Sequence, residues 1–185
     1  VGDGDGIEEA GRALAGAVFA DVGRTTHVLD PAAFEAAIGP RTRAVVPTHL
    51  YGTPCDMDAI LSIARARGIR VIEDCAQSTG ARYRGRRVGS LGDAAYYTFG
   101  LTKNMTTLSG AMITTDDDAV AASCRAAIDA TTHGGLGKAA KEAVTGLAMM
   151  FATHPLLYPW TLHPAIRAGN ALGRDPIHEP FGEPE

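Results

Sequence analysis

The sequence predicts an α/β protein whose sheet is mostly parallel and carries helices on both faces. Strand and helix patterns alternate between residues 18 and 72, and such alternation is typical of a layered α/β domain. The apolar runs in this stretch are short and nearly continuous, which indicates parallel strands that are buried on both faces. The composition agrees, because 45% hydrophobic and 21% charged residues is an ordinary globular balance for a chain of 185 residues.

The first elements are expected to be a strand, a helix and a second strand. The apolar run AVFADV, residues 17–22, predicts the first strand. A helix is expected over 29–38, because Asp30 is a good N-cap and Pro31 suits the first helical position. The run RAVVPTH, residues 43–49, predicts the second strand and leads into a loop that contains glycine.

A second helix and two further strands follow. The helix is expected over 56–68, with Asp56 as its N-cap and Gly68 as the left-handed residue that ends it. The runs IRVIED, residues 69–74, and AAYYTF, residues 94–99, predict the third and fourth strands.

The Gly-rich segment between these two strands, residues 80–93, interrupts the alternation. Its glycines are expected at turns, and because it does not open a helix we do not interpret it as a phosphate-binding loop. A fifth strand is expected at GAMITT, residues 110–115. The following helix, 116–130, begins with three acids, which the helix dipole favours.

The charge and the cysteine content limit the function classes. With a formal net charge of −4 and no basic patch, the chain lacks the features of a nucleic-acid-binding protein. Its three cysteines, Cys55, Cys75 and Cys124, form no CxxC pair, and separated thiols in odd number suit a cytoplasmic, reducing location. The six histidines include no HxxxH or HxH pair beside an acid cluster, so we expect no metal site.

Polar residues gather where two of the expected strands end. Asp74 ends the third strand, and Gln77 lies three positions later. Thr98 lies at the end of the expected fourth strand, and Lys103 lies five positions later. Because ligands of open α/β sheets bind beyond the carboxyl ends of the strands, we expect these side chains to converge at one edge of the sheet.

A carboxylate, a hydroxyl and a lysine at one edge suit pyridoxal 5′-phosphate. A lysine forms a Schiff base with the aldehyde of this cofactor, a carboxylate keeps its pyridinium nitrogen protonated, and a hydroxyl donates to its phosphate. Each residue also has a structural interpretation. Asp74 would equally serve as a turn cap, and Lys103 would equally be a solvated surface charge.

Four motifs between residues 49 and 104 carry a family resemblance: HLYG, VIEDCAQ, GSLGD and TFGLTKN, in this order. Together they make the chain resemble the DegT/StrS family of pyridoxal-phosphate-dependent sugar aminotransferases, a branch of the fold-type I enzymes. The resemblance begins near AVFADV and extends to about residue 125. It implies that the fold is the large domain of such an enzyme, in incomplete form.

The resemblance also implies a role for each site residue. Lys103 matches the Schiff-base lysine and is the expected catalytic residue, whereas Asp74 matches the acid on the pyridinium nitrogen. Gln77 matches the residue that lies against the cofactor ring. Thr98 stands where the family most often has a phosphate-binding serine, so the hydroxyl is kept.

For His49 and Tyr51 the resemblance gives no firm catalytic role, and we expect both to pack at the strand end. The activity that it implies is transfer of an amino group from a donor such as glutamate to a keto-sugar, usually nucleotide-linked, by a homodimer. Two alternatives remain. One is a sugar dehydratase on the same scaffold, which the lysine at position 103 disfavours because those relatives have histidine there. The other is an inactive, truncated copy of such an enzyme.

Four segments are expected along the chain. Residues 1–17 form a truncated N-terminal segment that does not replace the Gly/Ser/Thr-rich phosphate cup of the family. Residues 18–132 form the part of the large domain that binds pyridoxal phosphate. Residues 133–172 form a hydrophobic helical insertion, and residues 173–185 a flexible tail rich in proline and acids. The chain is therefore expected to be a fragment.

The hydrophobic insertion contains 24 residues, 143–166, without Asp, Glu, Lys or Arg. This length is sufficient to cross a bilayer, but Pro155, Pro159 and Pro164 would break any single helix. We therefore expect two buried or interfacial helices joined at THPLLYP. Peripheral contact with a membrane, or contact with a protein partner, is the hypothesis for this segment.

Overall fold

The computed structural model describes residues 16–100, 103–130 and 135–171. The contacts between residues divide the chain into two compact units, Val1–Ala130 and Thr131–Glu185. The two units are described separately below. The boundaries predicted from the sequence for the four segments remain predictions.

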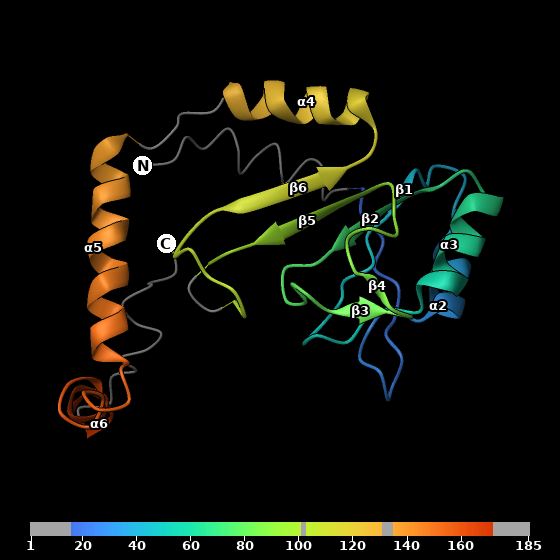
Figure 1. Ribbon diagram of the computed structural model, residues 1–185. Coiled ribbons are helices and arrows are strands. Elements are labelled where there is room, and N and C mark those ends of the chain that lie inside the picture. Colours follow the sequence, from blue (N-terminus) through green and yellow to red (C-terminus); the bar gives the residue numbers. More distant parts are fainter. Residues whose placement is uncertain (1–15, 101–102, 131–134, 172–185) are drawn as a thin grey trace. The chain divides into compact units, whose positions relative to one another are not determined.

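The first unit is built on a four-stranded sheet in the order β1-β2-β5-β6 (Figure 1). Its strands are β1 (Ala44–Val45), β2 (Arg70–Asp74), β5 (Ala94–Thr98) and β6 (Ala111–Thr115). The first three are parallel, and β6 runs antiparallel to β5. This confirms the mostly parallel sheet that the sequence predicts.

Three helices of this unit begin at aspartate caps, two of which were expected from the sequence. The side chain of Asp30 accepts from the first backbone N–H groups of α2 (Pro31–Ala37), and Asp56 caps α3 (Met57–Ala66) in the same way. Asp117 caps α4 (Asp118–Asp129). Each carboxylate satisfies N–H groups that the first helical turn leaves without a partner.

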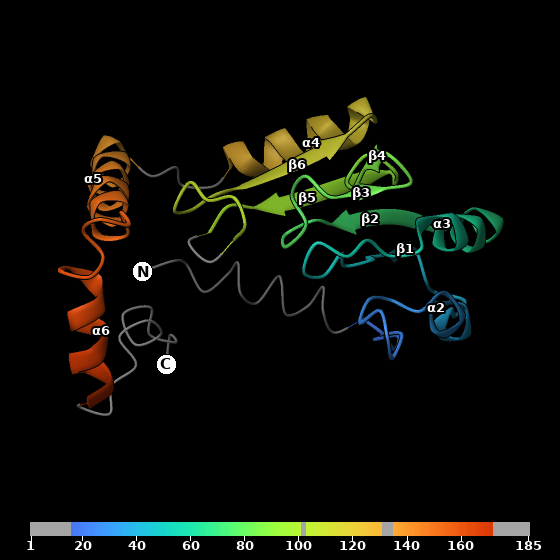
Figure 2. The same cartoon turned by 60° about the horizontal axis from the view of Figure 1, so that its bottom comes forward.

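Helices α3 and α4 each pack against a strand that is next to them in the sequence, and α2 packs against α3. Figure 2 shows the strands side by side, with α4 along β6 and α3 beside β1 and β2. The main core lies under α2 and α3 and is made of buried apolar side chains. Examples are Phe34, Val45, Met57, Ile60 and Val71. Burial of this apolar area is the main favourable term for the unit.

The strand expected at residues 17–22 is wrong. This segment forms no strand, and its one ladder contact is an isolated bridge between Val22 and Leu29. The side chain of Phe19 is 92% exposed. An apolar hollow of about 540 Å³ lies between this segment and β1. In the described part of the chain the segment therefore does not pair with β1, and the bridge to Leu29 alone does not make a strand.

The strand expected at residues 43–49 is shorter than predicted. The ladder covers Ala44–Val45 and resumes only as a bridge between Thr48 and Asp74. Pro47 lies in the gap, and a proline has no N–H to donate to a ladder.

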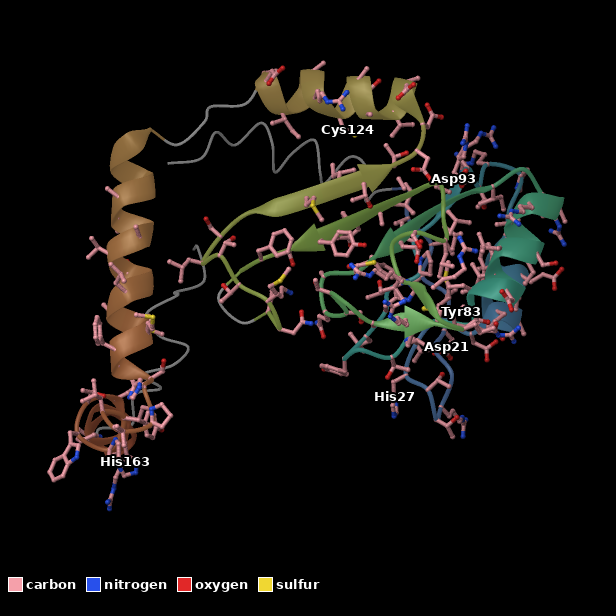
Figure 3. All side chains as sticks on the ribbon, in the orientation of Figure 1. Asp21, His27, Tyr83, Asp93, Cys124 and His163 are labelled. Atoms are coloured by element: carbon pink, nitrogen blue, oxygen red, sulfur yellow. The ribbon has the colours of Figure 1, made fainter. Side chains whose placement is uncertain are left out.

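The Gly-rich segment contains an unexpected hairpin, β3 (Arg82–Tyr83) and β4 (Arg86–Arg87), which turns through Arg84 and Gly85 in the left-handed region. The hydroxyl of Tyr83 donates to Asp56 over 2.7 Å, and Figure 3 shows Tyr83 beside α3. The N-cap of α3 therefore also holds this hairpin in place.

The second unit contains two helices, α5 (Leu136–Ala152) and α6 (Leu162–Ala171), joined by residues 153–161. Within the described residues, neither these nor any other helix is both long and apolar enough to span a bilayer.

Candidate cofactor site

The site residues expected from the sequence lie at the carboxyl edge of the sheet. Asp74 is the last residue of β2, and Thr98 is the last residue of β5. Gln77 lies in the loop after β2, and Lys103 lies half-buried in the loop after β5. Because β2 and β5 are adjacent and parallel, both loops leave the sheet at the same edge.

Three groups of the chain fix the carboxylate of Asp74. The hydroxyl of Thr48 donates to its Oδ2 over 3.2 Å, and the backbone N–H of Ala76 donates to its Oδ1 over 2.9 Å. The third is the hydroxyl of Tyr96, which lies directly opposite Asp74 in the β2–β5 register. Burial raises the pKa of Tyr96, and the hydrogen bond to Asp74 raises it further, so this phenol stays protonated and donates.

Thr98 lies two residues beyond Tyr96 and therefore on the same face of β5 as Tyr96. Its hydroxyl oxygen is buried and has no hydrogen-bond partner among the described residues. Buried polar groups are almost always satisfied. An unsatisfied hydroxyl at the carboxyl edge of a parallel sheet fits a ligand that accepts hydrogen bonds, such as a phosphate.

The loops that carry Gln77 and Lys103 are tied to neighbouring segments. The side-chain amide of Asn104 donates to the carbonyl oxygen of Thr79 over 2.9 Å, which joins the loop after β5 to the loop after β2. The carbonyl of Gln77 accepts from the N–H of Gly52 over 3.2 Å. The structure thus brings the two loops together.

Sequence reasoning missed Glu73, the residue beside Asp74. Its side chain is fully buried on the opposite face of β2. It accepts hydrogen bonds from His49 Nε2 at 3.0 Å and from the backbone N–H groups of Gly89, Leu91 and Gly92 at 2.7–2.8 Å. The Gly-rich segment thus encloses an internal carboxylate with its N–H groups. An acid inside the apolar run IRVIE was the available signal.

Two opposing effects act on the pKa of Glu73. Burial raises it, but the hydrogen bonds from His49 and the three backbone N–H groups favour the charged form more strongly. The pKa therefore lies below the usual value, and Glu73 is a carboxylate. His49 accepts from the N–H of Cys55 at Nδ1 over 3.1 Å, so Nε2 carries the proton that it donates to Glu73.

The structure gives different answers for His49 and Tyr51. His49 is fully buried, in agreement with the expected packing role. Tyr51 is 82% exposed and has a φ of 52°, so the expected packing of this residue is wrong. The reversal of the chain at Tyr51 and Gly52, both in the left-handed region, turns the phenol away from the core.

Among the described residues, His49, Glu73 and Cys75 lie close enough to be tested as metal ligands. Both ring nitrogens of His49 are already in hydrogen bonds with the protein. Burial raises the pKa of the Cys75 thiol to about 12, so it stays protonated. The cluster is satisfied internally and is a structural network.

An α/β sheet that presents a fixed carboxylate, an unsatisfied hydroxyl and a lysine-bearing loop at its carboxyl edge defines a cofactor-binding enzyme domain. Residues 8–150 match the model of the DegT/DnrJ/EryC1/StrS aminotransferase family. The chain belongs to this family, whose members depend on pyridoxal phosphate, as the resemblance of the motifs implies.

Known relatives agree with this assignment. The chain is 52% identical over 108 residues to GDP-perosamine synthase of Caulobacter vibrioides, an alignment that covers 58% of this chain and 29% of the relative. It is 49% identical over 104 residues to the spore coat polysaccharide biosynthesis protein SpsC of Bacillus subtilis, covering 56% and 27%. The chain thus spans under a third of the length of these relatives.

Solved structures extend the likeness to the fold. DesI, whose crystal structure was analysed in the presence of its TDP-sugar product, is 43% identical, with a TM-score of 0.56 over 59% of this chain and 28% of that chain. An E. coli GDP-4-keto-6-deoxy-D-mannose-3-dehydratase with bound hydrated PLP is 28% identical, with a TM-score of 0.51 over 54% of this chain and 26% of that chain.

Proposed function

We propose that this chain is the cofactor-binding part of a sugar aminotransferase, and that Lys103 binds pyridoxal phosphate through a Schiff base. The observation that carries the proposal is the pair formed by Asp74 and Thr98. A carboxylate held by three donors and a buried hydroxyl without a partner lie on adjacent strands at one edge. These groups complement the pyridinium nitrogen and the phosphate of the cofactor.

The cofactor supplies an aldehyde that takes up amino groups and a ring that withdraws electrons. The residues of the chain hold and orient it. Asp74 would hold the protonated ring nitrogen, and Thr48 and Tyr96 keep its carboxylate in one position. Thr98 would donate its hydroxyl hydrogen to the phosphate, and Gln77 would lie against the ring.

Lys103 has a second role in this proposal, the transfer of a proton. With an amino acid such as glutamate as the amino donor, the free amine of Lys103 would act as the base that takes the proton from the α-carbon of the donor. The same amine would then deliver this proton to the former aldehyde carbon of the cofactor, which keeps the amino group. The half-buried position of Lys103 reduces its contact with water.

The acceptor is proposed to be a nucleotide-linked keto-sugar. This rests on the names of the relatives, which include a GDP-perosamine synthase and an enzyme solved with a TDP-sugar product. A homodimer is proposed for the complete protein. The dehydratase alternative is disfavoured, because this chain has lysine and not histidine at position 103.

The decisive experiment is reductive trapping on the full 185-residue chain. The chain is incubated with pyridoxal phosphate, reduced with borohydride and mapped by peptide mass spectrometry. The cofactor mass is expected on the peptide that contains Lys103, with loss of the adduct in Lys103→Ala. The chain has two further lysines, Lys138 and Lys141, so Lys141→Ala is the matched control. Random labelling of all lysines, or none at Lys103, contradicts the proposal and supports an inactive copy.

A further inference from the structure

The second unit exposes many large apolar side chains that the proposed function does not use. The segment formed by α5, the connecting residues 153–161 and α6 is called the apolar hairpin below. The sequence from residue 143 to 166 contains no charged side chain. The family match ends at residue 150, so the connection and α6 lie outside the part of the fold that the family model covers.

One side of α5 is apolar and open to solvent. Val144, Leu147, Met150 and Phe151 are all exposed. Their spacing of three and four residues places them on one side of the helix. Soluble proteins rarely leave a contiguous apolar strip of this kind exposed without a binding partner.

The connection between the helices extends this surface with its largest side chains. Leu156 is 77% exposed and Trp160 is 84% exposed. Tyr158 is also exposed, and its ring contacts that of His163 with the centroids 5.9 Å apart. Tryptophan and tyrosine are the side chains enriched at the boundary between water and lipid.

The backbone N–H groups of the connection are satisfied without water. Each N–H group from residue 153 to 161 either donates to an acceptor in the same unit or is absent because the residue is Pro155 or Pro159. The hydroxyl of Thr161 also donates internally, to the carbonyl oxygens of Ala152 and Leu157. A segment can enter the apolar part of a bilayer only when its backbone donors are satisfied in this way.

The charges around the apolar hairpin favour an anionic lipid surface over a neutral one. Within residues 135–171 the sequence has three basic residues, Lys138, Lys141 and Arg167, and one acid, Glu142, although the whole chain has a net charge of −4. The described side chains of Lys141 and Arg167 are exposed on either side of the uncharged stretch. Basic residues that flank an apolar face complement anionic headgroups.

We propose that the apolar hairpin docks on an anionic lipid surface and lies in the interface without crossing it. The absence of a bilayer-spanning helix among the described residues agrees with a one-sided mode of insertion. The satisfied N–H groups of the connection, the exposed aromatic side chains and the flanking basic residues favour a lipid surface over a polar protein partner.

The chain provides its own probe for this proposal, because Trp160 is its single tryptophan. The full chain is mixed with vesicles of phosphatidylcholine containing phosphatidylglycerol, and both flotation and tryptophan emission are measured. The chain is expected to float with these vesicles and to shift its emission to shorter wavelength. Binding is expected to weaken in high salt, because screening reduces the attraction of the basic residues.

Two matched variants locate the contact. Leu156→Glu is expected to reduce vesicle binding by about tenfold, because a charge replaces an apolar side chain in the contact. Phe19→Glu introduces the same charge at an even more exposed position of the first unit and is expected to bind as the wild type does. Circular dichroism checks that both variants keep their helices.

Three results would overturn the proposal. The first is a wild-type chain that does not float with anionic vesicles. The second is an equal loss of binding in Leu156→Glu and Phe19→Glu, which would indicate unspecific adhesion. The third is an emission shift that grows with protein concentration in the absence of vesicles, which would show that a second copy covers the hairpin.

Discussion

Two neighbouring carboxylates of β2, Glu73 and Asp74, point to opposite faces of the sheet and have different partners. Glu73 is fully buried and accepts four hydrogen bonds from groups of the chain. Asp74 is only half-buried, and near it the hydroxyl of Thr98 has no partner among the described residues. One face is therefore complete, whereas the other is arranged for a ligand.

Burial thus separates the two carboxylates, since the fold encloses Glu73 and leaves Asp74 at the edge that we propose to bind the cofactor. The donors around Glu73 are the buried ring of His49 and three N–H groups of the Gly-rich segment. Removal of the Glu73 carboxylate therefore disturbs the fold. The donors around Asp74 hold one carboxylate in position and leave the neighbouring edge available. Four predictions test the comparison.

The largest effect is expected from exchange of each carboxylate for its amide. Glu73→Gln should lower the free energy of unfolding by about 3 kcal/mol, because three backbone N–H groups lose a charged acceptor in the interior. Asp74→Asn should cost about 1 kcal/mol and should weaken binding of pyridoxal phosphate. Urea unfolding and a cofactor titration measure the two effects, and equal losses of stability would remove the distinction between the faces.

The glycines around Glu73 should show the next largest effect. A Cβ atom at Gly92 would lie 2.7 Å from the backbone oxygen of Val71, which cannot move without displacing β2. Gly92→Ala should therefore lower the free energy of unfolding by about 2 kcal/mol. Gly39→Ala is the control, since nothing lies within 4 Å of a Cβ atom there. A neutral Gly92→Ala would show that the loop is free to relax away from Glu73.

Acid should reduce the contribution of Glu73 to the free energy of unfolding. The pKa of Glu73 is held below its ordinary value of 4.5, so its ionised form stabilises the fold fully above that value. This stabilisation is lost as the pH falls through the lowered pKa of the folded state. The difference in unfolding free energy between wild type and Glu73→Gln should therefore shrink below about pH 4.5. A difference that stays constant to pH 3 would mean that Glu73 is not the titrating group.

The smallest effect is expected from two adjacent tyrosines on opposite faces. Tyr96→Phe removes a hydrogen bond to Asp74 and should weaken cofactor binding by about fivefold, in line with the loss of about 1 kcal/mol. Tyr97→Phe removes a bond to the carbonyl oxygen of Val88, which is 3.0 Å away. It should lower stability by a similar amount and leave cofactor binding unchanged. The reverse pattern would contradict the assignment of the two faces.

Local patterns were sufficient to predict most of the helices and longer strands of the first unit. Asp30 and Asp56 are the N-caps expected from the sequence, because capping depends on a short polar side chain and the next few N–H groups. The runs that form β2, β5 and β6 were also recognised. The strand expected at residues 17–22 is wrong, because strand formation requires a neighbour that no local pattern contains.

In the candidate site too, local patterns indicated some residues and missed one that depends on distant segments. Asp74, Gln77, Thr98 and Lys103 were predicted as candidates because each stands at or after the end of a recognisable strand. Glu73 was missed, since a buried acid is unfavourable until its donors are known. Those donors come from segments up to 24 residues away in the sequence.

The sequence by itself determined the strand-ending residues, the helix caps and the motifs of the DegT/DnrJ/EryC1/StrS aminotransferase family. These depend on residue identity and on spacing along the chain. Only the tertiary structure decided that Glu73 is an internal support, that Tyr96 holds Asp74, and that the hydroxyl of Thr98 has no partner among the described residues. The physical reason is that burial and hydrogen bonding depend on distant segments, whose approach only folding sets.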